Sequence, residues 1–316
     1  RDCLLSRGLG DVYKRQPLYA SIIGNVINFC LNAFFLFVLH KGVAGVATAT
    51  VISRIINLVI VVLLGAVLVK AKQHPERESN RAVMGQIIRI GLPSACETAI
   101  YNVSMTLVIR FLNQMDAQGL NVTARSYTMQ ITNFSYCVGA ALAQANAIMT
   151  GWHIGAKEYD ACDRGTKKAA VIGVIVAVIL ETVFTLCSGW IMQLFSKDPQ
   201  MVSLVGKLLA IDIVLEIGRV TNLVYGQALK TSGDAVFPVV MGACFMILCS
   251  VGGTYLFGIR LGLLAVGAYI GMTGDECVRA VGMYLRWKSG KWKEKGLVKS
   301  LSLIHISEPT RQEAIS

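Results

Sequence analysis

The sequence predicts an all-α membrane protein with about eight transmembrane helices, and three observations support this fold class. Hydrophobic residues make up 54% of the chain, charged residues only 16%, and the mean hydropathy is +0.57. Apolar runs of about twenty residues, long enough to cross roughly 30 Å of hydrocarbon, recur along the chain. The polar connections between these runs alternate between basic and nearly uncharged. Such a composition lies far from that of a soluble domain, so the chain is predicted to be polytopic.

Each predicted helix is an apolar run between two polar connections. In chain order the runs cover 18–39, 46–69, 88–112, 124–149, 169–195, 204–229, 237–257 and 263–285. The connections at 40–45, 113–121, 196–202 and 258–262 carry few positive charges, whereas the alternate ones contain KAKQHPERESNR, HIGAKEYDACDRGTKK, LKTSGD and RWKSGKWKEKGLVK. Because positively charged loops stay in the cytoplasm, we expect the basic connections and the C-terminus to be cytoplasmic. The longest polar connection predicts a cytoplasmic linker over residues 72–87.

The two ends of the chain are related through their codons. SRGLGDVYKRQ at 6–16 and LSLIHISEPTR at 301–311 can be encoded by reverse-complementary DNA: CAG for Gln16 reverses to CTG for Leu301. We therefore interpret residues 1–16 and 301–316 as translated sequencing adapter and exclude them from the fold. The remaining residues are expected to be an N-terminally truncated fragment of a longer gene product.

Charged residues inside the predicted spans are the strongest functional signal, because each costs roughly 2.5–3.5 kcal/mol at the centre of a membrane helix. Asp212, Glu216 and Arg219 occur at i, i+4 and i+7, which places them on one face of a helix. The charged residues singled out in the other runs are Glu97, Glu181, Asp275, Glu276 and Arg279. Together these acids are expected to point into a shared interior.

These charges have two interpretations. In the first, Arg219 and Arg279 are charge partners that neutralise neighbouring acids and hold the bundle together. In the second, a carboxylate in low dielectric exchanges a proton or a sodium ion for substrate. The candidates for cation coupling are Glu97, Glu216, Asp212, Asp275 and Glu276. Glu97 is the first choice because it has no basic partner within its own helix, and Glu216 is the second.

Polar and aromatic side chains within the spans predict a substrate cavity. The candidates are Asn28, Asn32, Tyr101, Asn102, Gln144 and Asn222. Amides between membrane helices also form inter-helical hydrogen bonds, so both roles stay open for them. Tyrosines in such a cavity suit a flat apolar cation.

Several classes of function are disfavoured by the sequence. No Walker-type phosphate loop, HExxH, paired CxxC or GxSxG motif occurs, so we expect no enzyme activity and assign no catalytic residue. The net charge of +11 comes from short loops rather than from a basic aromatic face, so no nucleic-acid partner is expected. We expect no cofactor, and no metal beyond Na⁺ as an alternative to H⁺. The expected partners are the lipid bilayer and small organic cations.

Four stretches carry a likeness to a known family: IRIGLPSACETA, GAALAQANAIMTGWHIGAKEYDAC, LKTSGDAVFP and GVAGVATATVISR. Together they resemble the multidrug and toxic compound extrusion (MATE) family over nearly the whole of 17–299. The resemblance implies a monomeric antiporter of two six-helix lobes in the bacterial cytoplasmic membrane, which exports drug-like organic cations in exchange for Na⁺ or H⁺. Residues 17–71 then hold the last two helices of the first lobe, and residues 88–300 the second lobe.

The resemblance also marks departures. The family's tenth-helix acid falls at Arg219 here, and its seventh-helix acid near Tyr101 or Asn102. It follows from the resemblance that Glu97, one turn away, takes over the acid's role. Two alternatives stay open: a flippase for lipid-linked precursors in the same superfamily, which would need a more cationic cavity, and a membrane-embedded enzyme, which would need clustered His, Asp or Ser.

Overall fold

The computed structural model describes residues 20–70, 80–116 and 118–294, with only the backbone described for 64–70 and 80–94. Within these ranges every regular element is a helix and no strand is present, which confirms the predicted all-α class. The two stretches interpreted as adapter and residues 72–79 of the predicted linker lie outside the described residues. The chain divides into two units, Arg1–Asn80 and Arg81–Ser316, and each is described by itself.

The first unit is a helical hairpin. One helix covers Ala20–Val38 and ends in a π-helical segment, η1 (Phe34–Val38), and α2 covers Gly42–Lys70. The Asn28 amide donates a hydrogen bond of 2.9 Å to the Ser53 hydroxyl on α2, and the Asn32 amide donates one of 3.0 Å to Asn28 Oδ1. The Asn28 amide therefore forms an inter-helical hydrogen bond, whereas the Asn32 amide bonds to Asn28 within the same helix.

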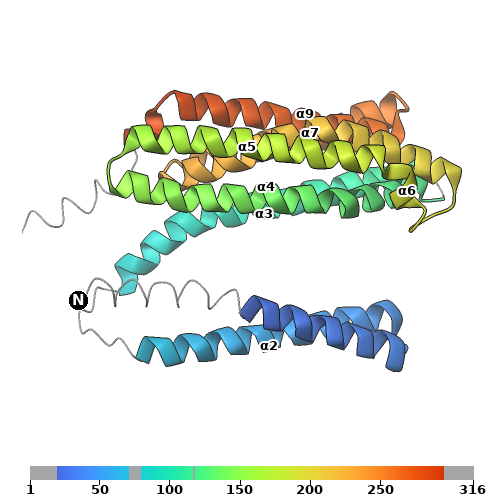
Figure 1. Ribbon diagram of the computed structural model, residues 1–316, viewed down its shortest axis with the longest axis horizontal. Coiled ribbons are helices and arrows are strands. Elements are labelled where there is room, and N and C mark those ends of the chain that lie inside the picture. Colours follow the sequence, from blue (N-terminus) through green and yellow to red (C-terminus); the bar gives the residue numbers. More distant parts are fainter. Residues whose placement is uncertain (1–19, 71–79, 117, 295–316) are drawn as a thin grey trace, which may run out of the picture. The chain divides into compact units, whose positions relative to one another are not determined.

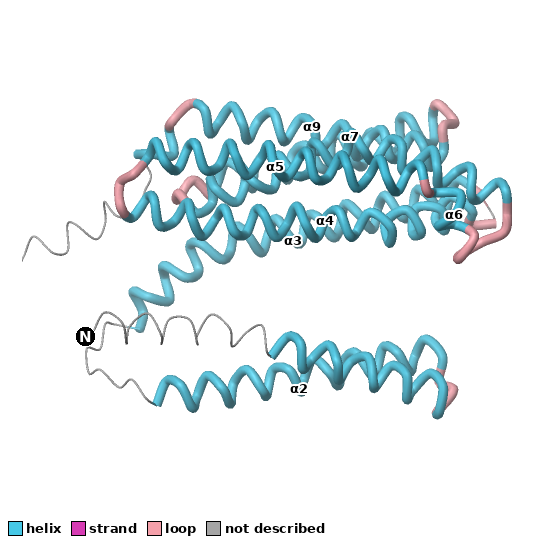
Figure 2. The backbone as a smooth tube through the Cα atoms, viewed as in Figure 1, coloured by secondary structure: helices cyan, strands magenta, loops and turns pink. Residues whose placement is uncertain are grey.

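The second unit is a bundle of long helices (Figures 1 and 2). Its elements are α3 (Asn80–Met115), α4 (Leu120–Gly155), α5 (Tyr159–Leu186), the short α6 (Ser188–Met192), α7 (Pro199–Thr231), α8 (Val236–Phe245), the π-helical η2 (Met246–Val251) and η3 (Thr254–Arg260), α9 (Leu264–Lys288) and the 3₁₀ turn η4 (Lys291–Glu294). Helix α7 packs against α4, α5 and α9. Its side chains therefore meet groups from three other helices.

Several predicted spans differ from the observed helices. Helix α3 begins at Asn80 rather than at 88, because helical hydrogen bonding continues through polar residues beyond an apolar run. The run predicted to reach 195 contains a break, since α5 ends at Leu186 and α6 is a separate short helix. The seventh run forms one helical rod, Val236–Arg260, whose second half is π-helical. Apolar length alone reveals neither the break nor the π-helical winding.

Four helices among the described residues are long and apolar enough to cross a membrane: Ala20–Val38, Gly42–Leu63, Tyr159–Leu186 and Val236–Arg260. Helices α3, α4, α7 and α9 contain 36, 36, 33 and 25 residues and carry most of the interior charges, whereas α5 contributes Glu181. A helix that presents polar groups to its neighbours rather than to lipid has this composition. The membrane class is therefore confirmed, whereas the number of eight spans stays a prediction.

Two apolar cores hold the bundle at either end. One contains Leu112, Leu208 and Leu215 and lies where α4, α7 and α9 begin; the other contains Val224 and Trp287 and lies toward the ends of α7 and α9. Burial of such side chains contributes roughly 1.5–3 kcal/mol each, so the cores fix the register of the helices. The middle of α7, between the cores, is left for polar groups.

Candidate functional site

A close crossing of α7 and α9 marks the polar centre of the second unit. Gly218 on α7 lies so near α9 that a Cβ there would stand 2.9 Å from the backbone nitrogen of Cys277 and 2.9 Å from the backbone carbon of Glu276. Only glycine allows backbones to approach this closely without a shift. The crossing therefore brings the charged stripe of α7 against the charged residues of α9.

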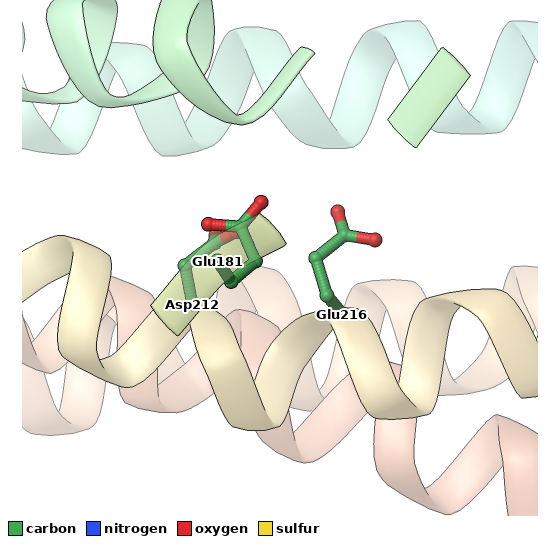
Figure 3. Close-up of side chains that lie close together, drawn as sticks. All are labelled: Glu181, Asp212 and Glu216. Carbon is green, nitrogen blue, oxygen red and sulfur yellow. The ribbon is translucent and has the colours of Figure 1, made fainter. Parts of the chain in front are cut away.

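Three carboxyl groups gather next to this crossing. Glu181 from α5 and Asp212 and Glu216 from α7 offer carboxylate oxygens that all lie within 4.8 Å of one another, and Figure 3 shows the two α7 side chains projecting from the same side of the helix. The three residues are 0%, 2% and 0% exposed. Three carboxylates this close in a low-dielectric interior repel one another strongly when all are ionised. Either some of them carry a proton, or a bound cation balances their charge. We call Glu181, Asp212 and Glu216 the carboxylate cluster.

The carboxylate cluster has unused hydrogen-bonding capacity. Both oxygens of Glu181, Oδ2 of Asp212 and Oε2 of Glu216 are buried without a hydrogen-bond partner among the described residues. The buried Ser135 hydroxyl on α4 is close enough to interact with Glu181, although neither group makes a hydrogen bond of normal geometry. Carboxylate and hydroxyl oxygens are ligands suited to a hard cation. The cluster can therefore hold protons or a small cation.

The acids of α9 form a second network, in which every carboxylate oxygen has a partner. Asp275 accepts hydrogen bonds of 2.9 Å from Arg279 Nε and 2.9 Å from Arg279 Nη2, and one of 3.0 Å from the Ser250 hydroxyl. Glu276 Oε1 lies 2.9 Å from Arg279 Nη2, and its Oε2 accepts a hydrogen bond of 3.0 Å from the Asn222 amide on α7. We call Asp275, Glu276 and Arg279 the α9 network.

Arg219 connects the carboxylate cluster to the α9 network. Its Nη1 donates a hydrogen bond to Glu216, and its Nε lies 3.8 Å from Glu276 Oε1. The guanidinium thus stands between an acid of the cluster and an acid of α9. A change in the charge of Glu216 alters the balance of attraction on Arg219, which gives the cluster a physical route to α9.

Glu97 is paired with a residue far away in the sequence. Lys230, at the end of α7, donates a hydrogen bond of 2.6 Å to Glu97 Oε2, and the two side chains are 24% and 23% exposed. Glu97 has no basic partner within its own helix, but Lys230 from α7 supplies one. The negative charge of Glu97 is therefore already balanced.

A cavity of about 660 Å³ adjoins these groups, a size typical of sites for drug-sized ligands. Its charged lining comprises the acids Glu97, Asp212, Asp275 and Glu276 and the bases Arg125, Arg219, Lys230 and Arg279. Its apolar lining includes Met105, Met129, Met246, Met272 and Met283. Methionine side chains are flexible and polarizable, so this lining adapts to ligands of different shapes.

The structure separates the residues predicted from sequence into three groups. Those that line the cavity are Glu97, Tyr101, Asp212, Arg219, Asn222, Asp275, Glu276 and Arg279. Glu216 is buried beside the cavity. Asn102 is not in the lining because, one residue after Tyr101, it faces about 100° around the helix, and its amide bonds to the Thr98 carbonyl at 2.9 Å. Gln144 is exposed and outside the lining, and Asn28 and Asn32 belong to the first unit.

The sequence placed Glu181 in the shared interior but did not make it a coupling candidate, because its two carboxylate neighbours come from another helix. Two further residues of the site, Lys230 and Arg125, were missed. Lys230 lies 133 residues from Glu97, and no local pattern joins them. Arg125 was overlooked although it is a charge inside a predicted span, which is the signal that identified the other residues.

Comparisons with known proteins agree with this architecture. The MatE family model matches residues 93–256. An uncharacterized transporter, YisQ, from Bacillus subtilis is 33% identical over 291 residues, which cover 90% of this chain and 64% of that protein. The probable multidrug resistance protein NorM from Thermotoga maritima is 22% identical, with 92% of this chain and 63% of that protein covered. The chain therefore spans less than two thirds of the length of these relatives.

A solved structure shares the fold. The crystal structure of the eukaryotic MATE transporter AtDTX14 superposes with a TM-score of 0.76 at 19% sequence identity, with 88% of this chain and 63% of that chain covered. At this identity the likeness concerns the fold alone. The match to the MatE family model, which covers more than half of the chain, establishes that this protein belongs to the MATE family.

Proposed function

We propose that the protein is a multi-pass secondary transporter that exports amphipathic organic compounds, organic cations among them, in exchange for Na⁺ or H⁺. The observation that carries this proposal is the carboxylate cluster, because Asp212 belongs both to the cluster and to the cavity lining. A coupling ion and a substrate that share one acid compete for it. The names of the multidrug relatives agree with an export role.

The coupling step follows from electrostatics. When protons or a cation occupy the carboxylate cluster, repulsion among its acids is relieved and the interior is close to neutral. When the protons or the cation leave, the negative charge of Glu216 attracts Arg219 more strongly. The attraction between Arg219 and Glu276 across the α7–α9 crossing then weakens. Two charge states thus favour two arrangements of the helices, and alternating access arises as a shift between their populations.

The structure changes the order of the coupling candidates. Glu97 was the first choice, but Lys230 neutralises it at 2.6 Å. Glu181, Asp212 and Glu216 retain buried oxygens without a partner among the described residues, so we rank them first. Asp275 and Glu276 hold α9 in place through Arg279.

The orientation and setting of the transporter belong to the same proposal. The basic connections favour a cytoplasmic C-terminus, and the bacterial relatives favour the cytoplasmic membrane of a bacterium. The exposed apolar residues Ile172, Ile175, Ile179 and Val183 recur at helical spacing along α5, as expected of a face toward lipid. We propose that the transporter acts as a monomer.

Two other functions are weaker on physical grounds. A flippase for a pyrophosphate-linked lipid needs a cavity with excess positive charge, whereas four acids balance four bases in this lining. A membrane-embedded enzyme needs a reactive group beside its base, and no histidine or serine–histidine pair occurs in the cavity lining among the described residues.

Efflux measurements test the proposal. The protein is expressed from its complete gene in bacteria that lack their own pumps, and loss of a cationic rhodamine ester is followed with and without a sodium or proton gradient. We expect gradient-dependent efflux that falls about tenfold or more in Glu181→Gln and Asp212→Asn, because a neutral amide cannot bind and release the coupling ion as a carboxylate does. Glu97→Gln is the control in the same cavity and is expected to retain most of the activity. Equal loss in all three variants would contradict the role of the carboxylate cluster.

A further inference from the structure

Arg125 differs from the other cations of the cavity. Arg219, Lys230 and Arg279 each pair with a carboxylate, whereas Arg125 has no acidic partner among the residues that the structure describes. It is 6% exposed, its Nε has no hydrogen-bond partner, and its Nη2 approaches the sulfur of Met105 at 3.6 Å. The nearest acid before it in the chain, Asp116, already accepts hydrogen bonds from the backbone N–H groups of Leu120 and Asn121. A buried guanidinium without a counter-charge is strongly unfavourable.

Arg125 lies among side chains that line the cavity and can contact a ligand. Arg125, Met129 and Thr132 occur at i, i+4 and i+7 on α4, so they form one stripe, and all three line the cavity. Tyr269 on α9 lines the same cavity. The stripe thus offers a cation, a hydroxyl and flexible apolar surface side by side.

We propose that Arg125 holds the carboxylate of those amphipathic substrates that carry one, and that this contact determines how tightly the cavity binds them. A guanidinium holds a carboxylate through two parallel hydrogen bonds, which makes it selective for planar acids. The inference rests on the proposed function for transport, but the binding step stands without it.

The number of unpaired charges favours a carboxylate over a phosphate. A phosphate or pyrophosphate group carries more charge than one guanidinium balances, and the other bases in the described lining are already paired. A single carboxylate matches the one unpaired cation. The basic group of a zwitterion can meanwhile lie toward Asp212, where it competes with the coupling ion.

A matched pair of dyes tests the inference. Rhodamine B carries a free carboxylate, and its ethyl ester has the same ring system without that charge. Efflux of each dye is measured from cells, and binding of each is measured by fluorescence anisotropy with the purified protein in lipid nanodiscs. The variants are Arg125→Gln, Arg125→Lys, and the control Arg110→Gln, which removes an exposed arginine of α3 outside the cavity lining.

We expect Arg125→Gln to weaken binding and efflux of rhodamine B about tenfold or more and to change those of the ester by less than about twofold, because one charge-assisted contact is lost. Arg125→Lys should retain part of the rhodamine B affinity, and Arg110→Gln should resemble the unaltered protein. Equal loss of both dyes in Arg125→Gln would assign Arg125 a structural role and overturn the inference.

The remaining outcomes separate the two proposals. Transport of the ester without binding of rhodamine B by the unaltered protein would overturn the inference and leave the proposed function standing. If neither dye is transported, the proposed function fails, and the binding assay alone decides the inference. The preference of the unaltered protein for the acid over the ester gives an answer even if Arg125→Gln does not fold.

Discussion

Helices α7 and α9 each place two acids and an arginine within about two turns, and they use them differently. On α9, all four oxygens of Asp275 and Glu276 have partners, and Arg279 contacts both acids. On α7, Asp212 and Glu216 keep buried oxygens without a partner among the described residues, and they stand beside Glu181. A compensated network holds helices together, whereas an uncompensated cluster can take up and release charge. Removing a charge should therefore have opposite effects on stability in the two places.

The largest effect is expected from breaking the α9 network. Arg279→Leu leaves Asp275 and Glu276 buried with too few counter-charges, which we expect to cost about 3–5 kcal/mol of unfolding free energy. Thermal unfolding of the purified protein in detergent measures the loss. The double variant Asp275→Asn, Arg279→Leu removes one stranded charge and should regain part of the stability. An unchanged unfolding midpoint in Arg279→Leu would show that the network does not stabilise the fold.

A smaller effect is expected from separating the two helices. In Gly218→Ala the new Cβ would lie 2.9 Å from the backbone of α9, so the helices must move apart. Such overpacking costs about 1–3 kcal/mol. Gly165→Ala on α5 is the matched control, because its Cβ meets no atom within 4 Å, and the change should stabilise by about 0.4–1 kcal/mol. Equal midpoints for the two variants would contradict the close crossing.

The carboxylate cluster should respond in the opposite direction to the α9 network. Glu181→Gln removes one of three crowded acids, so we expect stability to stay the same or rise by up to about 1 kcal/mol. Thermal unfolding at neutral pH measures this change. Glu158→Gln alters an exposed acid next to the start of α5 and serves as the control. A loss of stability as large as that of Arg279→Leu would mean that Glu181 is a structural partner.

The smallest effect concerns an acid outside the spans. Asp116 accepts hydrogen bonds from the backbone N–H groups of Asn121 and Leu120 and from the Asn121 amide, which lower its pKa below the ordinary value of 3.8. A carboxyl with a lowered pKa stabilises the fold above its unfolded-state value, and that contribution disappears as the pH falls through the folded-state value.

Unfolding of the unaltered protein and Asp116→Asn should therefore be compared across pH. We expect the difference in their midpoints to be constant above about pH 5 and to shrink below about pH 4. A difference that grows as the pH falls would contradict the assignment of these hydrogen bonds to the ionised form.

Much of the architecture was predictable because it depends on local pattern. The approximate positions of most helices follow from apolar runs, and the same-face arrangement of Asp212, Glu216 and Arg219 follows from helical spacing. The family resemblance was predictable from four short stretches and is confirmed. The helix break after Leu186 and the π-helical end of Val236–Arg260 were not, because both depend on backbone hydrogen bonds that apolar length does not report.

The sequence by itself determined the membrane class, the order of the helices and the presence of charges inside the spans, since each follows from composition and from the cost of placing a charge in hydrocarbon. Tertiary structure alone decided which charges meet. Lys230 reaches Glu97 across 133 residues, Glu181 joins two acids from α7, and Arg125 is left without an acidic partner in the described chain. Pairing depends on the distance between atoms of different helices, and the packing at Gly218 and the two apolar cores sets that distance.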